Sequence, residues 1–178
     1  MPTTIFANTM IAAIAAAGVA LTSFVGVQPQ GAAYGDGALL RLSQPDADAN
    51  AEKGFIRADR NGDAMLSVDE FASQAIVKAE LAQLNGFVAV ETGGKVQTIF
   101  VPAAERTALS ASEHVRIDAV ARNAFYAFAG DDGWMSKDDY LRMQNVLFDE
   151  SDLNSNGALT RRELVIYAQR QARLTAGA

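Results

Sequence analysis

Apolar positions recur at helical spacing in several segments of the chain, and short polar loops separate these segments. The spacing predicts a helix over residues 111–128, where Ser110 and Glu113 form a capping box at the start. A second helix is predicted from Val68 to Leu84, because Asn85 and Gly86 supply a stop signal. Residues 86–102 alternate instead: two β-rich runs flank Gly93 and Gly94, which predicts a β-hairpin.

The N-terminal part of the chain follows a different pattern. Residues 5–27 are apolar, rich in Ala and uncharged, and no charged side chain precedes Asp36. Such a stretch predicts either a signal peptide over residues 1–33, cleaved after Ala33 or earlier after Ala20, or a membrane anchor. Residues 28–50 are rich in Gln, Pro, Gly, Ala and Asp, apart from a short apolar patch at Ala38 to Leu42. We therefore predict a linker over residues 34–47 and a folded domain over residues 48–174.

A polar loop at residues 152–163 carries oxygen-bearing side chains at alternate positions. It matches the pattern D-x-[DN]-x-[DN]-G-x5-E of a calcium-binding loop, with Gly157 at the sharp bend. Calcium prefers about six to eight oxygen ligands, and a carboxylate with two oxygens closes such a loop. The predicted ligands are Asp152, Asn154, Asn156, the Ala158 carbonyl, Thr160 through a water molecule, and Glu163.

A second copy of this pattern occupies residues 59–70. Its predicted ligands are Asp59, Asn61, Asp63, the Met65 carbonyl, Ser67 and Glu70. The bend residue is Ala64, and a left-handed conformation costs about 1–2 kcal/mol for a residue with a Cβ atom. This strain should lower the calcium affinity of residues 59–70. Their three carboxylates, against two in residues 152–163, should raise it. The sequence therefore predicts two calcium ions without ranking the two sites.

Residues 128–139 retain only part of the pattern. Asp132, Gly133, Met135, Ser136 and Asp139 stand at matching places, but two carboxylates are missing, which predicts a structural role with weak calcium binding or none. Trp134 at the seventh place is expected beside the short strand of residues 152–163. Residues 140–151 are expected to form one helix that serves both loops.

The apolar residues around both complete loops stand at the positions where a known family has them. Phe55 and Phe148 precede them by four residues, Leu66 and Leu159 take the eighth place, and Phe71 and Leu164 follow the last Glu. The chain thus resembles the EF-hand family over about residues 48–174, in the compact form common among exported bacterial proteins. The resemblance implies a mainly α fold of helix-loop-helix repeats with an inserted β-hairpin, preceded by the apolar leader helix. The implied parts are a hand at 48–84, the hairpin at 86–102, a remnant hand at 111–147 and an intact hand at 140–174.

Composition narrows the function classes. The net charge of −6 disfavours nucleic acid and anionic membrane surfaces as partners. The chain has no Cys, which excludes disulfides, thiolate metal sites and Cys nucleophiles. His114 is the only histidine, so the sequence shows no group of histidines that could act together. It also shows no Gly-rich phosphate loop, and we therefore do not expect an enzyme.

These observations predict an exported calcium-binding protein, periplasmic or secreted, in which the ion stabilises the fold or supports partner binding. The alternative is a scaffold subunit in a complex, or one anchored to a membrane by a retained segment 5–27, with partly vestigial loops. The hairpin has two interpretations. It covers the hand at 48–84 as part of the core, or it binds a protein partner through Ile99, Phe100 and Val101.

Overall fold

The described chain is mainly helical, with three small pairs of antiparallel strands. The computed structural model describes residues 35–102, 107–130 and 132–172, so the leader predicted over residues 1–33 lies outside the described residues. The elements are β1 (Arg41–Ser43), α2 (Gln44–Ala58), β2 (Met65–Leu66), α3 (Val68–Asn85), β3 (Phe87–Thr92), β4 (Lys95–Phe100), α4 (Ala111–Phe128), β5 (Met135–Ser136), α5 (Lys137–Asp149), β6 (Ala158–Thr160) and α6 (Arg162–Gln171). Within these ranges, no helix has the length and apolar character needed to cross a membrane.

Side-chain caps determine where several helices begin. Ser67, Ser110 and Ser136 each cap a helix and accept a hydrogen bond from the backbone N–H of the acidic residue three positions later. That acidic side chain accepts in turn from the cap residue's N–H, which satisfies two amides that the helix itself leaves unpaired. The predicted helices at 68–84 and 111–128 are confirmed to within one residue, and Gly86 ends α3 with φ 71°.

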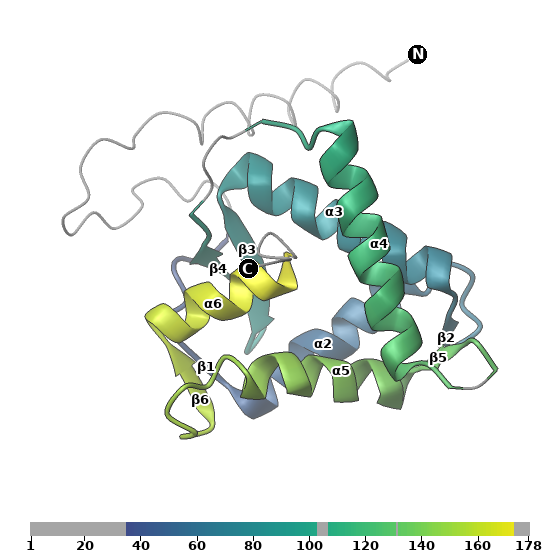
Figure 1. Ribbon diagram of the computed structural model, residues 1–178. Coiled ribbons are helices and arrows are strands. Elements are labelled where there is room, and N and C mark those ends of the chain that lie inside the picture. Colours follow the sequence, from purple (N-terminus) through teal and green to yellow (C-terminus); the bar gives the residue numbers. More distant parts are fainter. Residues whose placement is uncertain (1–34, 103–106, 131, 173–178) are drawn as a thin grey trace, which may run out of the picture.

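Two of the strand pairs join distant parts of the chain. β1 pairs with β6 and places Leu42 opposite Leu159, while β2 pairs with β5 and places Leu66 opposite Met135. All four of these side chains are fully buried. Figure 1 shows the two pairs at opposite ends of α5, so each pair joins the segments at one end of this helix.

The linker predicted for residues 34–47 is wrong over most of that range. Residues 36–39 run beside β4, β1 follows, and α2 begins at Gln44. Leu39 and Leu42 are buried, and Ser43 caps α2 by accepting a hydrogen bond from the Asp46 N–H. The segment is ordered because two leucines of its short apolar patch, Leu39 and Leu42, enter a core, although the polar residues around the patch suggested a linker.

The buried apolar residues form two clusters, which we call the first and the second core. The first core lies between α2, α3, α4 and α5, and its aromatic rings include Phe55, Phe71, Phe125 and Tyr140. In it, Phe55 and Phe71 pack their rings 5.8 Å and 6.3 Å from that of Tyr140. The second core gathers Leu39, Leu42, Ala47, Val90, Ile99, Val101, Phe148, Leu159, Leu164, Tyr167 and Ala168.

The predicted hairpin is confirmed as β3 and β4, joined at Gly93 and Gly94. It contacts α2 and α3, and α2 fixes it through an ion pair between Lys53 and Glu91. Its buried side chains, however, enter the second core, so it covers the region of α6 as well as the helices at 48–84. Ile99 and Val101 are among them, which leaves these two side chains unavailable for the partner contact considered from the sequence.

Candidate metal centres

The predicted ligands lie in two loops that occupy equivalent positions between helices. Loop 1 (residues 59–70) connects α2 to α3, and loop 2 (residues 152–163) connects α5 to α6. In both loops the eighth place falls within the short strand, β2 or β6, and the leucine there is buried. The strand and the following helix therefore hold the second half of each loop in place.

Loop 1 folds around its own carboxylates. Backbone N–H groups of the loop donate to them, among them Ala64 to Asp59 Oδ2 (3.0 Å), Met65 to Asp63 Oδ1 (2.9 Å) and Ser67 to Glu70 Oε2 (3.0 Å). The Arg60 N–H donates to the other oxygen of Glu70 at 3.1 Å, so the last residue of the loop reaches back to the start. The first, fifth and twelfth places are thus oriented by the loop backbone.

Loop 2 repeats the bonds from the sixth, seventh and ninth places. The corresponding N–H donors are Gly157 to Asp152 Oδ2 (2.8 Å), Ala158 to Asn156 Oδ1 (2.9 Å) and Thr160 to Glu163 Oε2 (3.1 Å). The Asn154 amide donates to Glu163 Oε1 at 2.8 Å, which brings the third and twelfth places into direct contact. Two segments with different sequences thus share the backbone bonds to the first, fifth and twelfth places.

The backbone at the bend is left-handed in both loops. Gly157 has φ 74°, and Ala64 has φ 66°, the conformation that its place in the loop predicts. The residue at the fourth place is left-handed as well, with φ 74° at Gly62 and φ 55° at Ser155. Loop 1 therefore has a residue with a Cβ atom at the sixth place, and loop 2 has one at the fourth.

Both donor sets consist of oxygen atoms, which suits a hard cation such as calcium. Across the described residues, no three Asp, Glu, His or Cys side chains are gathered closely enough to hold a metal by themselves. Loop 2 contains only two carboxylates, and in loop 1 each carboxylate is bonded to loop amides. An ion bound here would therefore also use amide, hydroxyl and carbonyl oxygens, as the predicted ligand set requires.

The closing glutamates differ in their surroundings. Glu163 is only 6% exposed and accepts hydrogen bonds from Asn154 and Thr160, yet among the described residues no Lys, Arg or His forms an ion pair with it. A buried carboxylate without a cation is costly. Glu70 is more open, and the Ser67 backbone N–H, helped by the Ser67 hydroxyl and the Arg60 N–H, holds the pKa of Glu70 below its ordinary value.

The remnant loop (residues 128–139) keeps part of this geometry. Gly133 has φ 78°, the Trp134 N–H donates to Asp132 Oδ1, and the Ser136 N–H donates to Asp139 Oδ2. Phe128 at the first place supplies no carboxylate. Its strand β5 pairs with β2 of loop 1, so the expectation that Trp134 lies beside the strand of loop 2 is wrong.

The sequence did not lead us to predict the strand that pairs with loop 2. It is β1, and Leu42, Ser43 and Asp46 stand in the same relative positions as Met135, Ser136 and Asp139 of the remnant loop. Ser43 also bonds to the Asp46 carboxylate as Ser136 bonds to Asp139. The signal was a strand leucine followed by a helix-capping Ser-x-x-Asp, and it was present in the segment interpreted as a linker.

Comparison of the chain with protein-family models, with curated proteins and with solved structures found no match.

Proposed function

We propose that the protein binds two calcium ions, one in each loop, and that both loops are EF-hands. Loop 1 would hold its ion through Asp59, Asn61, Asp63, the Met65 carbonyl, Ser67 and Glu70. Loop 2 would use Asp152, Asn154, Asn156, the Ala158 carbonyl, Thr160 and Glu163. The ion supplies positive charge that neutralises and crosslinks these oxygens.

The main support is the shared hydrogen-bond arrangement of the two loops. The N–H groups of the sixth, seventh and ninth places donate to the first, fifth and twelfth places in both. These bonds orient side chains at the places where the calcium-loop pattern requires oxygen ligands. Left-handed bends at Ala64 and Gly157 support the same registers, although Ala at such a bend is unfavourable.

The surroundings of Glu163 support a cation in loop 2 in particular. Its carboxylate is buried beside the second core, and Leu164 and Tyr167 of the same helix belong to that core. A bound calcium ion would compensate the buried charge and would link Glu163 at the start of α6 to Asp152 just after α5. Calcium therefore has a structural role in this proposal, because it joins two helices that the second core also joins.

Calorimetric titration of calcium into the metal-free full chain tests the proposal. We expect two binding events, and Glu70→Gln and Glu163→Gln should each abolish one, because glutamine keeps the shape of the side chain but cannot offer two charged oxygens. Asp132→Asn in the remnant loop is the matched control, since it also removes one carboxylate. It should leave both events in place.

The outcomes separate calcium binding from other roles. Binding that survives in the Glu70→Gln, Glu163→Gln double variant would show that the ions bind elsewhere. Absence of heat and of any change in far-ultraviolet circular dichroism up to several millimolar calcium would refute the proposal, because extracellular sites of this kind have Kd values of about 10⁻⁴–10⁻³ M. A scaffold subunit with vestigial loops would then be the better explanation.

We also propose that the protein is exported. The support is the uncharged apolar stretch at residues 5–27, which lies outside the described residues. Outside the cytoplasm calcium is often abundant, so loops of modest affinity would remain filled. Mass spectrometry of the protein recovered from its host tests this, since cleavage after Ala33 or Ala20 and retention of the whole segment give different masses.

A further inference from the structure

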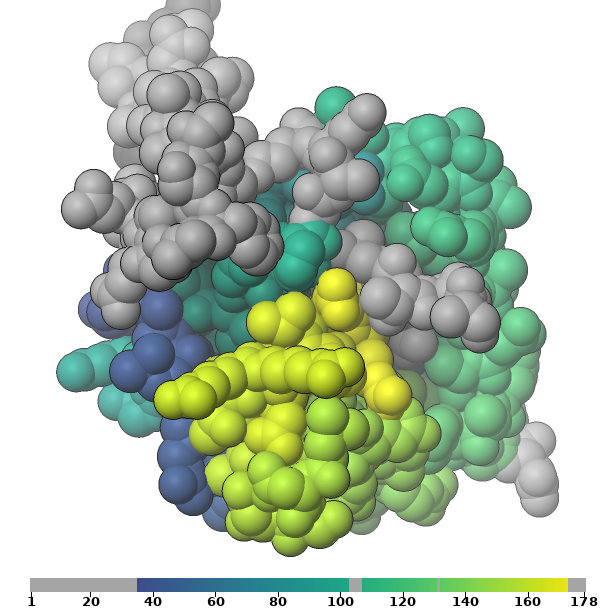
Figure 2. Space-filling model, turned by 60° about the vertical axis from the view of Figure 1, so that its left-hand side comes forward, coloured from purple at the N-terminus to yellow at the C-terminus, as the bar shows by residue number. Residues whose placement is uncertain are grey.

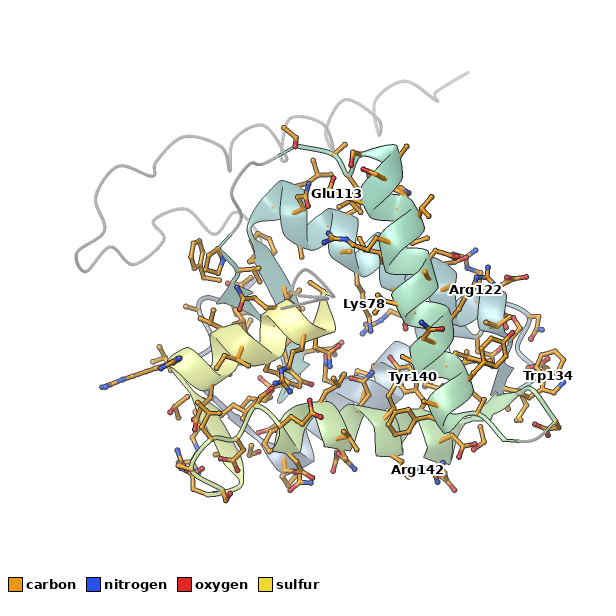
Figure 3. The ribbon with its side chains drawn as sticks, viewed as in Figure 1. Lys78, Glu113, Arg122, Trp134, Tyr140 and Arg142 are labelled. Carbon is orange, nitrogen blue, oxygen red and sulfur yellow. The ribbon has the colours of Figure 1, made fainter. Side chains whose placement is uncertain are left out.

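An arginine joins the two ends of the remnant loop. The Arg142 guanidinium on α5 donates to the backbone carbonyl of Phe128 at 3.2 Å and to Asp139 Oδ1 at 2.6 Å. Phe128 is the first residue of the remnant loop and Asp139 is the last. Figure 3 shows Arg142 on α5 and Trp134 in the loop that precedes this helix.

In the two complete loops, the ends carry the ligands that calcium would share. Asp59 and Glu70 occupy the first and last places of loop 1, and Asp152 and Glu163 occupy those of loop 2. A calcium ion held by both would therefore tie the ends together. The residue three positions after the closing carboxylate is Ser73 or Ile166 there, so a cationic side chain stands at this position only beside the remnant loop.

We propose that Arg142 replaces the calcium ion of the remnant loop and, by holding this loop closed without metal, positions β5 as the partner strand of loop 1. This inference rests on the proposed function of loop 1. The guanidinium brings a permanent positive charge, and the two N–H donors of its Nη2 lie in a fixed plane, so this one nitrogen bonds to both the carbonyl and the carboxylate. Lysine has the charge but lacks this geometry.

The effect reaches loop 1 through the strand pair. Asp139 accepts from the N–H and the hydroxyl of Ser136, and Ser136 lies opposite Met65, whose carbonyl is a predicted calcium ligand. A loosened remnant loop would thus loosen the seventh place of loop 1. Loop 2 pairs with β1 at the other end of α5, so it should not respond.

Calcium titrations of the full chain in the Glu163→Gln background isolate loop 1 and test this role. Arg142→Gln should lower the calcium affinity of loop 1 about two- to fivefold, and Arg142→Lys should restore only part of it. Lys137→Gln is the matched control. Lys137 is also a partly exposed cation at the start of α5, but its ion pair is with Glu52 on α2. Loss of a nearby positive charge alone should strengthen calcium binding, so the two explanations differ in sign.

A metal-free measurement keeps this inference separate from the proposed function. In the presence of a chelator, Arg142→Gln should accelerate amide hydrogen exchange at Leu66 and Met135 and should shift the emission of Trp134, whereas Lys137→Gln should do neither. Unchanged exchange, or a loop 1 affinity that stays constant or rises in Arg142→Gln, would overturn the inference. If the unmodified chain binds no calcium, the proposed function fails, and hydrogen exchange alone still decides whether Arg142 holds the loop.

Discussion

Exchange of the bend residues of the two loops gives the sharpest test of the calcium registers. Ala64 and Gly157 occupy the same place, with φ 66° and φ 74°. Ala64 is exposed, and a Cβ atom built on Gly157 would meet no atom within 4 Å. Packing therefore contributes little at either position. Ala64→Gly and Gly157→Ala should thus measure the backbone conformation itself.

The magnitude follows from two opposing terms. A left-handed conformation costs a residue with a Cβ atom about 1–2 kcal/mol. Glycine returns about 0.5–1 kcal/mol of this, because it loses more backbone freedom when the loop becomes ordered. The net gain of about 0.5–1 kcal/mol corresponds to a factor of about two to five in affinity. Ala64→Gly should therefore strengthen calcium binding in loop 1 by that factor.

Calorimetric titration of single-loop backgrounds provides the assay. Ala64→Gly is measured with loop 2 silenced by Glu163→Gln, and Gly157→Ala with loop 1 silenced by Glu70→Gln. The two changes should have opposite signs and similar size. If Ala64→Gly weakens binding while Gly157→Ala has no effect, the sixth-place register of these loops is wrong.

Three further predictions follow from the strand pairs and the loop hydrogen bonds. Leu42→Ala should destabilise the protein by about 2–5 kcal/mol in chemical denaturation and should weaken loop 2 but not loop 1, because Leu42 is fully buried opposite Leu159. Calcium binding should show a Hill coefficient of about 1, and Glu163→Gln should leave the affinity of loop 1 unchanged, since the two loops belong to different strand pairs. The pKa of Glu70 is lower in the folded than in the unfolded state, so the Glu70 carboxylate stabilises the fold fully above its unfolded pKa, and this stabilisation is lost as the pH falls through the folded pKa. Ser67→Ala should move this loss to higher pH, because it removes one of the hydrogen bonds that lower the pKa. Nuclear magnetic resonance of the Glu70 carboxyl carbon would detect the change.

Local structure was predictable where it depends on neighbours in the sequence. The capping box at Ser110 and Glu113 located the start of α4, and Gly93 with Gly94 located the hairpin turn. Expected φ values at Ala64 and Gly157 followed from the twelve-residue pattern. Each of these features depends on contacts within a few residues, which a single sequence displays directly.

The pairing of distant segments was not predictable in the same way. Leu42 lies in a short apolar patch within a mostly polar segment, and its burial depends on Leu159 at the other end of the described chain. Likewise, β5 pairs with β2 while α4, which precedes β5, packs against α3, which follows β2. Only the recurrence of a Ser-x-x-Asp cap at Ser43 and Ser136 pointed to the relation between these segments.

Pairing of the first strand with the last constrains how the chain folds. β1 precedes every described helix, and its partner β6 comes immediately before α6, so the second core takes residues from both ends of the described chain. Figure 2 shows the yellow C-terminal helix on the same face as the purple and blue N-terminal residues. Contacts between such distant residues form slowly, because a long loop must close first. Synthesis must therefore have passed β6 and α6 before this half can close, and until then the leucines of β1 lack their partners in the second core.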